Sequence, residues 1–184
     1  MSLKTYSQKR HFDRTPEPAA GKPHKHSGAL QYCVQRHHAT RLHYDFRLEV
    51  DGALKSWAVP KGPTLDPGEK RLAMMVEDHP LEYGGFEGVI PKGNYGAGTM
   101  MVWDTGTYHA PGHAGRDESE VLVGQALEDG HLRFVLHGVK LSGEFALVRT
   151  KQGPNTWLLF KKGDTASSTA LPGERIVRCL ATGP

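Results

Sequence analysis

QRHHATRLHYDFRLEV, residues 35–50, alternates strictly between apolar and polar side chains from Leu42 onward. The side chains of one parity are Leu42, Tyr44, Phe46, Leu48 and Val50, and those of the other are His43, Asp45, Arg47 and Glu49. A period of two that is rich in aromatic and aliphatic residues predicts a β-strand. Successive side chains of a strand point to opposite faces, so we expect the apolar face to enter a core.

The polar face of this predicted strand carries an imidazole, a carboxylate and a guanidinium in a row. His43, Asp45 and Arg47 stand roughly 6.6 Å apart at Cα, so the first two can share one metal ion. His37 comes beside His43 if residues 38–41 turn the chain. Two histidines and a carboxylate are a common ligand set for a divalent transition metal, and Arg47 would then hold an anion bound to that metal. The alternative is a polar face that is merely solvated.

Composition limits the class of protein. The chain has 184 residues, 38% of them hydrophobic, which predicts one domain with a core of its own. A net charge of +3 permits a nucleic-acid partner without requiring one. Cys33 and Cys179 are far apart and have no zinc-like spacing, so we expect a reduced, cytoplasmic protein. No apolar run of about 18 residues and no apolar signal segment is present, which argues against a membrane span and against secretion.

Turn signals divide the chain into short apolar runs. The 22 glycines and 12 prolines favour a β-rich architecture, and Asp51-Gly52 predicts a hairpin. Residues 84–98 lack the strand-to-helix context and the ending of a phosphate loop, so we expect turns there. The best helix candidate is Asp117–Asp129, with Asp117 as cap and Gly130 as stop. The predicted strands are Leu30–Arg36, Leu42–Val50, Ala53–Val59, Arg71–Glu77, Thr99–Trp103 with a short continuation at 106–108, His131–His137, Leu141–Arg149 and Thr156–Lys162.

These elements predict a mainly β fold. About eight strands suggest a compact, single-domain β-barrel, closed or nearly closed, with one or a few flanking helices. We expect an irregular N-terminal arm over residues 1–28 that is partly ordered over the site, although composition alone favours a disordered tail, and a barrel domain over 29–162. Residues 163–184 are predicted to be a tail or a linker. The sequence leaves open whether the chain is free-standing or part of a larger protein.

Three longer strings carry a family resemblance: HATRLHYDFRLEVDGALKSWAVPKGP at 38–63, VEDHPLEY at 76–83 and FEGVIPKGNYGAGTMMVWD at 86–104. They resemble the 3'-phosphoesterase domain of bacterial ligase D, which belongs to non-homologous end-joining repair and also occurs as a free-standing protein. The resemblance runs from about Arg10 to Lys162. It implies a β-barrel hydrolase, dependent on manganese, that removes a 3'-terminal ribonucleoside from DNA and then hydrolyses the remaining 3'-phosphate.

The resemblance also implies roles for individual residues. The expected ligands of Mn²⁺, or of another divalent transition metal, are His37, His43 and Asp45. The residues expected to contact the scissile phosphate are Arg47, His79 and Tyr83. The positions that support the site are Gln35, Lys61, Arg71 and Glu77, with Arg10 and Glu17 in the N-terminal arm. His11 departs from the family pattern, which has an acidic residue at that position.

Phosphoryl chemistry suggests how these side chains would act. We expect Arg47 to grip a phosphate oxygen in bidentate fashion and Tyr83 to donate a neutral hydrogen bond. His79, if protonated, would stabilise negative charge or protonate the leaving oxygen. The expected partners are DNA with 3'-ribonucleotide or 3'-phosphate ends, together with ligase and polymerase domains or other end-joining proteins, but no membrane. A cytoplasmic, nucleoid-associated location would follow.

Two other functions fit parts of the pattern. His37, His43 and Asp45 also suit a non-haem Fe(II) oxygenase, whose turnover would depend on oxygen and 2-oxoglutarate. A non-catalytic module that binds DNA ends would instead bind without forming product in Mn²⁺. A manganese assay on a DNA end separates these alternatives.

Overall fold

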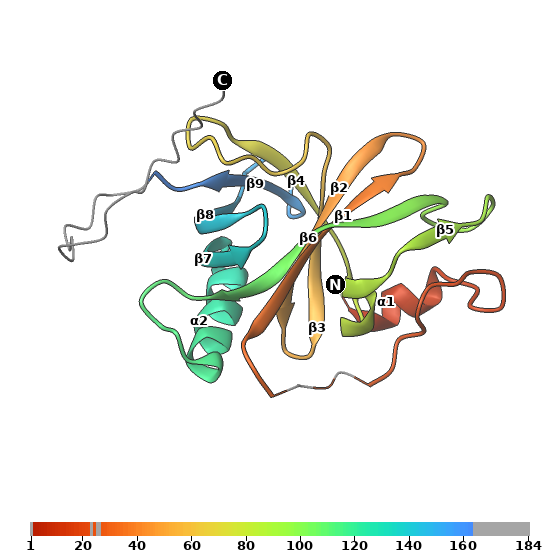
Figure 1. Cartoon of the computed structure of the whole chain (residues 1–184), viewed down its shortest axis with the longest axis horizontal. Helices are drawn as coiled ribbons and strands as arrows, with labels where there is room; N and C mark the ends of the chain where they lie inside the picture. The colour runs from red at the N-terminus through yellow and green to blue at the C-terminus, as the bar shows by residue number, and fades with distance from the viewer. Residues whose placement is uncertain (1, 23, 25–26, 164–184) are drawn as a thin grey trace, which may run out of the picture.

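The computed structural model describes residues 2–22, 24 and 27–163. Within these residues, nine strands form one antiparallel sheet in the order β1-β2-β3-β4-β9-β8-β7-β6-β5 (Figure 1). Pairing of β1 with β6 closes every strand except β5 into an eight-stranded barrel, which confirms the mainly β prediction. The elements are α1 Leu3–Gln8, β1 Leu30–His38, β2 Leu42–Val50, β3 Ala53–Val59, β4 Arg71–His79, the 3₁₀-helix η1 Leu81–Gly85, β5 Gly88–Ile90, β6 Gly98–His109, α2 Arg116–Asp129, β7 His131–Gly138, β8 Ser142–Arg149 and β9 Thr156–Lys161.

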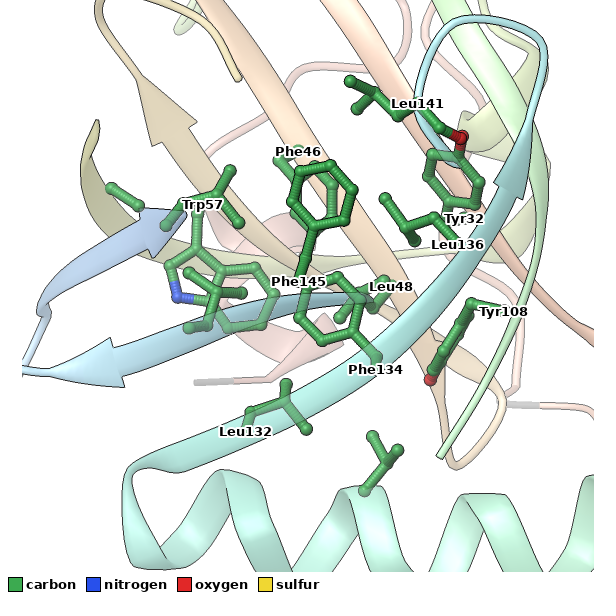
Figure 2. Packing of buried hydrophobic residues seen from close by; sticks show 14 of the residues in the cluster. Tyr32, Phe46, Leu48, Trp57, Tyr108, Leu132, Phe134, Leu136, Leu141 and Phe145 are labelled. Carbon is green, nitrogen blue, oxygen red and sulfur yellow. The ribbon is translucent and has the colours of Figure 1, made fainter. Parts of the chain in front are cut away.

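Aromatic side chains fill the inside of the barrel (Figure 2). Phe46 of β2 faces Phe134 of β7, with ring centroids 5.7 Å apart, and Phe134 stacks on Phe145 of β8. These three side chains are completely buried, as is Trp57 of β3. Large residues from strands across the barrel meet in this way because inward positions alternate along every strand. The alternate apolar side chains of residues 42–50 thus face the core as predicted, except that Leu42 at the start of the strand is 41% exposed.

Several strands are longer than local sequence predicted. β1 continues past Arg36 and β4 continues past Glu77, so His37 and His79 lie on strands. The strand predicted over Thr99–Trp103 and its continuation form one strand, β6, which pairs with β1 along its length through a bulge at Val34/Gln35. His37 is held in the ladder by partners on both sides, His43 and Met100, and His79 by Leu54 on one side.

The predicted helix is present. Its C-terminal end was predicted correctly, but its N-terminal cap was not. α2 begins at Arg116, and its N-cap is Gly115 rather than Asp117, which lies in the first turn. An acidic residue is favourable there as well as at the cap, so the sequence signal was ambiguous by two positions. Gly130 ends the helix with a φ of 78°, as predicted, because glycine adopts the left-handed conformation without strain. Neither helix in the described part of the chain is long and apolar enough to cross a membrane.

The N-terminal arm is not irregular throughout. Leu3–Gln8 forms α1, which packs against β4, so the prediction of an irregular arm is wrong for these residues. Tyr6 is completely buried in a second apolar cluster with Tyr83, Leu54 and Met100. Burial of an apolar ring gives this short helix a tertiary anchor that its own sequence did not reveal. The predicted tail after Gly163, and Cys179 with it, lies outside the described residues.

Candidate active site

The three predicted metal ligands meet on the hairpin of β1 and β2. His37 pairs directly with His43 across the hairpin, and Asp45 lies two residues further along β2. Nδ1 of His37 is 3.2 Å from Nε2 of His43, and the carboxylate oxygens of Asp45 lie 3.6 and 3.7 Å from these two nitrogens. One ligand atom from each residue lies within 4.8 Å of the others. The predicted proximity is therefore confirmed.

The hydrogen bonds around the two imidazoles suit a metal. Nε2 of His37 donates to the carbonyl oxygen of Gly96 at 2.9 Å, and Nδ1 of His43 donates to that of Arg41 at 3.0 Å. With these outer hydrogen bonds made, Nδ1 of His37 and Nε2 of His43 face each other, and each can offer a lone pair. Two lone pairs only 3.2 Å apart repel unless a cation lies between them. The residues present thus fit a divalent metal, with the outer hydrogen bonds setting the tautomers.

The polar face of β2 is buried, so the alternative of a merely solvated face is wrong. Asp45 is 6% exposed and Arg47 is 1% exposed. Burial opposes ionisation of the Asp45 carboxyl, but the Arg47 guanidinium beside it, helped by His37 and His43, lowers its pKa below the ordinary value. An anionic ligand is therefore available at neutral pH.

Arg47 is held by neighbours on every side. Its Nε donates to Gln35 at 2.8 Å, Nη1 donates to Ser56 at 2.8 Å, and Nη2 pairs with Asp45 at 3.2 Å. Gln35 is in turn fixed because its amide donates to two backbone carbonyls. These three contacts use one N–H group each, which leaves one on Nη1, beside Nδ1 of His79, and one on Nη2. A bidentate grip needs two parallel N–H groups, so the bidentate contact of Arg47 with a phosphate stays a prediction.

His79 is uncharged in this setting. Its Nδ1 donates to the carbonyl of Glu77 at 2.9 Å, while Nε2 lies 3.2 Å from Nη2 of Arg10 and accepts from it. Nδ1 also lies 2.9 Å from Nη1 of Arg47. Burial, followed by Arg47 and Arg10, lowers the pKa of His79 well below its ordinary value. The lowered pKa disfavours the protonated form of His79, and the neutral ring accepts from Arg10 through Nε2 while its Nδ1 side lies against Arg47.

The arm contributes charged side chains to this network. Arg10 of the arm donates to Glu17 at 2.9 Å and to Glu77 of β4 at 3.0 Å. Glu17 also accepts the hydroxyl hydrogen of Tyr83 at 2.8 Å. Burial, more than any other cause, raises the pKa of Tyr83, so its hydroxyl stays protonated. The neutral donor predicted for Tyr83 is present, but it is directed to Glu17.

One cavity of about 270 Å³ brings most of the predicted site residues together. The predicted residues that line it are Arg10, Glu17, His37, His43, Asp45, Arg47, Glu77, His79 and Tyr83. Gln35 lies behind the lining and supports Arg47. Lys61 and Arg71 lie elsewhere, in a separate surface hollow with Glu69 and Lys70, where Arg71 pairs with Glu69. His11 is exposed and does not line the cavity.

Sequence reasoning missed several residues of the site. Ser56 contacts both Arg47 and His79, and Tyr95 lines the cavity rim. Ser56 pairs with Arg47 in register, so it could have been found by aligning the predicted hairpin of residues 42–59. Tyr95 lies in a glycine-rich segment that carries no periodic signal.

A mainly β barrel with a two-histidine, one-carboxylate cluster beside a buried arginine defines a candidate metal-centre protein. The family model described as the DNA Ligase D 3'-phosphoesterase domain matches residues 35–149. The chain belongs to this family, as the resemblance implied.

Three similar proteins are consistent with this family. The chain is 55% identical over 165 residues to the multifunctional non-homologous end joining protein LigD of Pseudomonas aeruginosa, covering 88% of this chain and 19% of that protein. It is 44% identical over 167 residues to the protein of the same name from Mycolicibacterium smegmatis, covering 88% and 21%. It is 40% identical over 186 residues to the multifunctional non-homologous end joining DNA repair protein LigD of Mycobacterium tuberculosis, covering 98% and 22%. The chain thus spans about one fifth of the length of these relatives.

Proposed function

We propose that the chain is a manganese-dependent phosphoesterase that heals 3' ends of DNA. It would remove a 3'-terminal ribonucleoside as a phosphodiesterase and then remove the 3'-phosphate as a phosphomonoesterase. The observation that carries the proposal is the single cavity lined by the candidate metal ligands and by Arg47. Family membership supports phosphoester chemistry, and the resemblance in sequence supports the choice of manganese.

The residues of the cavity would divide the work. His37, His43 and Asp45 would hold the metal, which when bound would polarise a phosphate oxygen and lower the pKa of a water. The N–H of Arg47 Nη2 that does not face Asp45 would contact a second phosphate oxygen. Because its other donors are already fixed, this contact would need no reorganisation during the reaction.

Arg10 and Tyr83 would add to the phosphate site from the arm side. Nη2 of Arg10 contacts His79 with one N–H, which leaves a second N–H on a residue that lines the cavity. The hydroxyl of Tyr83 would turn from Glu17 to the phosphate when substrate binds. Gln35, Glu77 and Glu17 would hold the two guanidinium groups in position.

The retained DNA would follow β3 and β4. Ala58 and Val76 of these strands line the cavity, and the same strands lead to the basic corner, which we define as Lys61, Lys70 and Arg71. Cations outside the cavity are suited to backbone phosphates upstream of the reacting end. This gives Lys61 and Arg71 a role that does not require contact with the metal site.

The wider setting is also a proposal. The names of the relatives describe multifunctional proteins of non-homologous end joining. We infer that this chain works on DNA ends in the same process, with ligase and polymerase domains or other end-joining proteins as partners. A cytoplasmic, nucleoid-associated location follows from that role.

The decisive experiment uses a primer-template whose primer ends in one 3' ribonucleotide. In Mn²⁺ we expect a product shorter by one nucleoside that carries a 3'-phosphate, followed by a 3'-hydroxyl product of the same length. Excess chelator should stop both. Turnover that requires oxygen and 2-oxoglutarate would favour an oxygenase instead, and binding of ends without either product would favour a non-catalytic module.

A further inference from the structure

Tyr95 is a half-exposed aromatic ring at the rim of the cavity. It is 48% exposed, whereas Tyr83, which also lines the cavity, is 1% exposed. The proposed mechanism uses metal ligands and charged groups but gives this ring no task. A large apolar face left open beside a polar site is a common feature of sites that bind a flat ligand.

The loop that carries Tyr95 is fixed relative to the metal cluster. Backbone N–H groups of Asn94 and Ala97 donate to Pro91 and Asn94, each at 3.2 Å, which makes two successive turns. The next residue after Tyr95, Gly96, accepts the hydrogen bond from Nε2 of His37 at 2.9 Å. The ring is therefore one residue from the group that orients a candidate metal ligand, and a ligand stacked on it would have a defined position.

Cations of the arm lie against the same ring. Nζ of Lys9 donates to the Tyr95 hydroxyl at 3.2 Å and lies 4.6 Å from the ring centroid. Cζ of Arg10 lies 5.5 Å from that centroid. An aromatic ring with neighbouring cations is the combination by which proteins bind single nucleotides of a strand, because any base has a π-face and phosphates are anionic.

The two sides of the cavity differ in what they can hold. Toward β3 and β4 the wall leads on to the basic corner. On the Tyr95 side the lining includes Arg10 of the arm, whose Cζ lies 5.5 Å from the ring centroid, and Ile90 and Met100 add apolar surface. A cavity of about 270 Å³ suits one nucleoside rather than a continuing duplex.

We propose that Tyr95 stacks against the nucleobase of the 3'-terminal ribonucleoside that is removed, and so forms the site for the leaving nucleoside. This inference rests on the proposed function and names the part of the substrate that the rim recognises. A diester end carries that base, whereas a 3'-phosphate end has no nucleoside beyond its phosphate. Tyr95 should therefore act on the first reaction.

The test compares two substrates with two enzymes. The substrates are primer-templates that end in a 3' ribonucleotide with its base or in the same ribonucleotide without a base. For the end with a base, Tyr95→Ala should lower kcat/KM about 5- to 150-fold, mainly through KM, since stacking contributes in this range. For the abasic end, wild type and Tyr95→Ala should differ far less. If the effect of Tyr95→Ala depends on whether the base is present, the two changes are coupled, and the coupling isolates the contact between the ring and the base.

Further variants separate stacking from support of the fold. Tyr95→Phe keeps the ring and loses the hydroxyl contact with Lys9, so it should retain most of the preference for a base. Val121→Ala, on the exposed side of α2 at 73% exposure, is the control for a surface change away from the cavity. An equal loss by Tyr95→Ala on base-containing and abasic ends would overturn the inference. So would a comparable loss on a 3'-phosphate end, which would place the ring on the retained strand.

Failure of the inference and failure of the proposed function give different results. If wild type forms no product from any end in Mn²⁺, the proposed function is wrong. If wild type processes the end but Tyr95→Ala is equally active on it, only the stacking role is wrong.

Discussion

The two faces of β2 are buried to the same extent by opposite means. Phe46 and Leu48 on the inner face are 0% exposed, and Arg47 and Glu49 on the outer face are 1% and 0% exposed. The inner face packs against other apolar side chains of the barrel. The outer face is covered by partners of opposite charge, for example Asp45 beside Arg47 and Arg116 at 2.6 Å from Glu49.

The difference shows which face can carry chemistry. Apolar burial is non-directional, so the inner face gains stability from any neighbours that exclude water. Buried charges are tolerated only where each has its own partner, so the outer face depends on particular residues from several strands and from the arm. We expect changes to the inner face to act on stability, and changes to the outer face to act mainly on activity.

The largest expected effect on the outer face concerns the metal ligands. His43→Ala or Asp45→Ala should lower both reactions by about 10³-fold or more, because several kcal/mol of charge stabilisation is lost. The measurement is product formation in Mn²⁺, with thermal unfolding to show that the fold is retained. His38→Ala is the matched control, since His38 is an exposed neighbour of His37 outside the cavity. Equal activity of the ligand variants and this control would contradict the metal assignment.

A second prediction compares neighbouring residues on the two faces. Phe46→Ala should lower the free energy of unfolding by about 3–5 kcal/mol and leave activity per folded molecule largely intact. Arg47→Met should lower both reactions by about 10²- to 10³-fold at temperatures where it is folded, because a fixed donor is lost. Denaturant unfolding and initial rates measure the two effects. An active Arg47→Met enzyme would show that the outer face is structural.

His79 offers a finer test of the outer face. Removing this neutral ring, which accepts from Arg10 and lies against Arg47, frees both guanidinium groups to move, and a phosphate monoester, with nearly two negative charges, needs these cations more than a diester does. His79→Ala should therefore release the ribonucleoside but accumulate the 3'-phosphate product on a gel. His79→Asn keeps a donor toward the Glu77 carbonyl and should accumulate less. Accumulation to the same extent by both variants would contradict a positioning role of the His79 ring.

The lowered pKa of His79 also predicts a dependence of stability on pH. Below about pH 6.5 the unfolded chain binds a proton at this histidine that the folded protein excludes. Stability should therefore fall as pH decreases below that value, by up to about 1.4 kcal/mol per pH unit, until pH passes the folded pKa. Urea midpoints of wild type and His79→Asn should converge as pH is lowered from about 7 to 5. Parallel curves would show that His79 titrates normally when folded.

The smallest expected effect lies outside the cavity, in the basic corner. Lys61→Ala or Arg71→Ala should reduce the slope of log affinity against log salt by about one unit each for a primer-template. Binding titrations at several salt concentrations measure this slope. Lys151→Ala, an exposed lysine in the turn before β9, is the control. Unchanged slopes for the corner variants would mean that the retained strand takes another path.

The sequence by itself determined the strand β2 and the candidate metal cluster. Strict alternation over residues 42–50 specifies the strand and its inner face, because a shift of one residue would turn Phe46 and Leu48 out of the apolar core and bring charged side chains into it. The same alternation aligned His43 with Asp45, and a short turn was enough to bring His37 opposite. These are local relations, set by strand geometry and hairpin register, and they need no knowledge of the remaining chain.

Only the tertiary structure decided the electrostatic state of the site and the place of the arm. The pKa of His79 is lowered and the guanidinium of Arg47 is held in place because Arg10, Ser56 and Gln35 approach from other segments. The arm is far from β4 in sequence, and a six-residue helix has too little intrinsic stability to be predicted from pattern alone. A pKa and a hydrogen-bond geometry depend on every group within a few ångströms, and that set of neighbours exists only once distant strands and the arm have packed together.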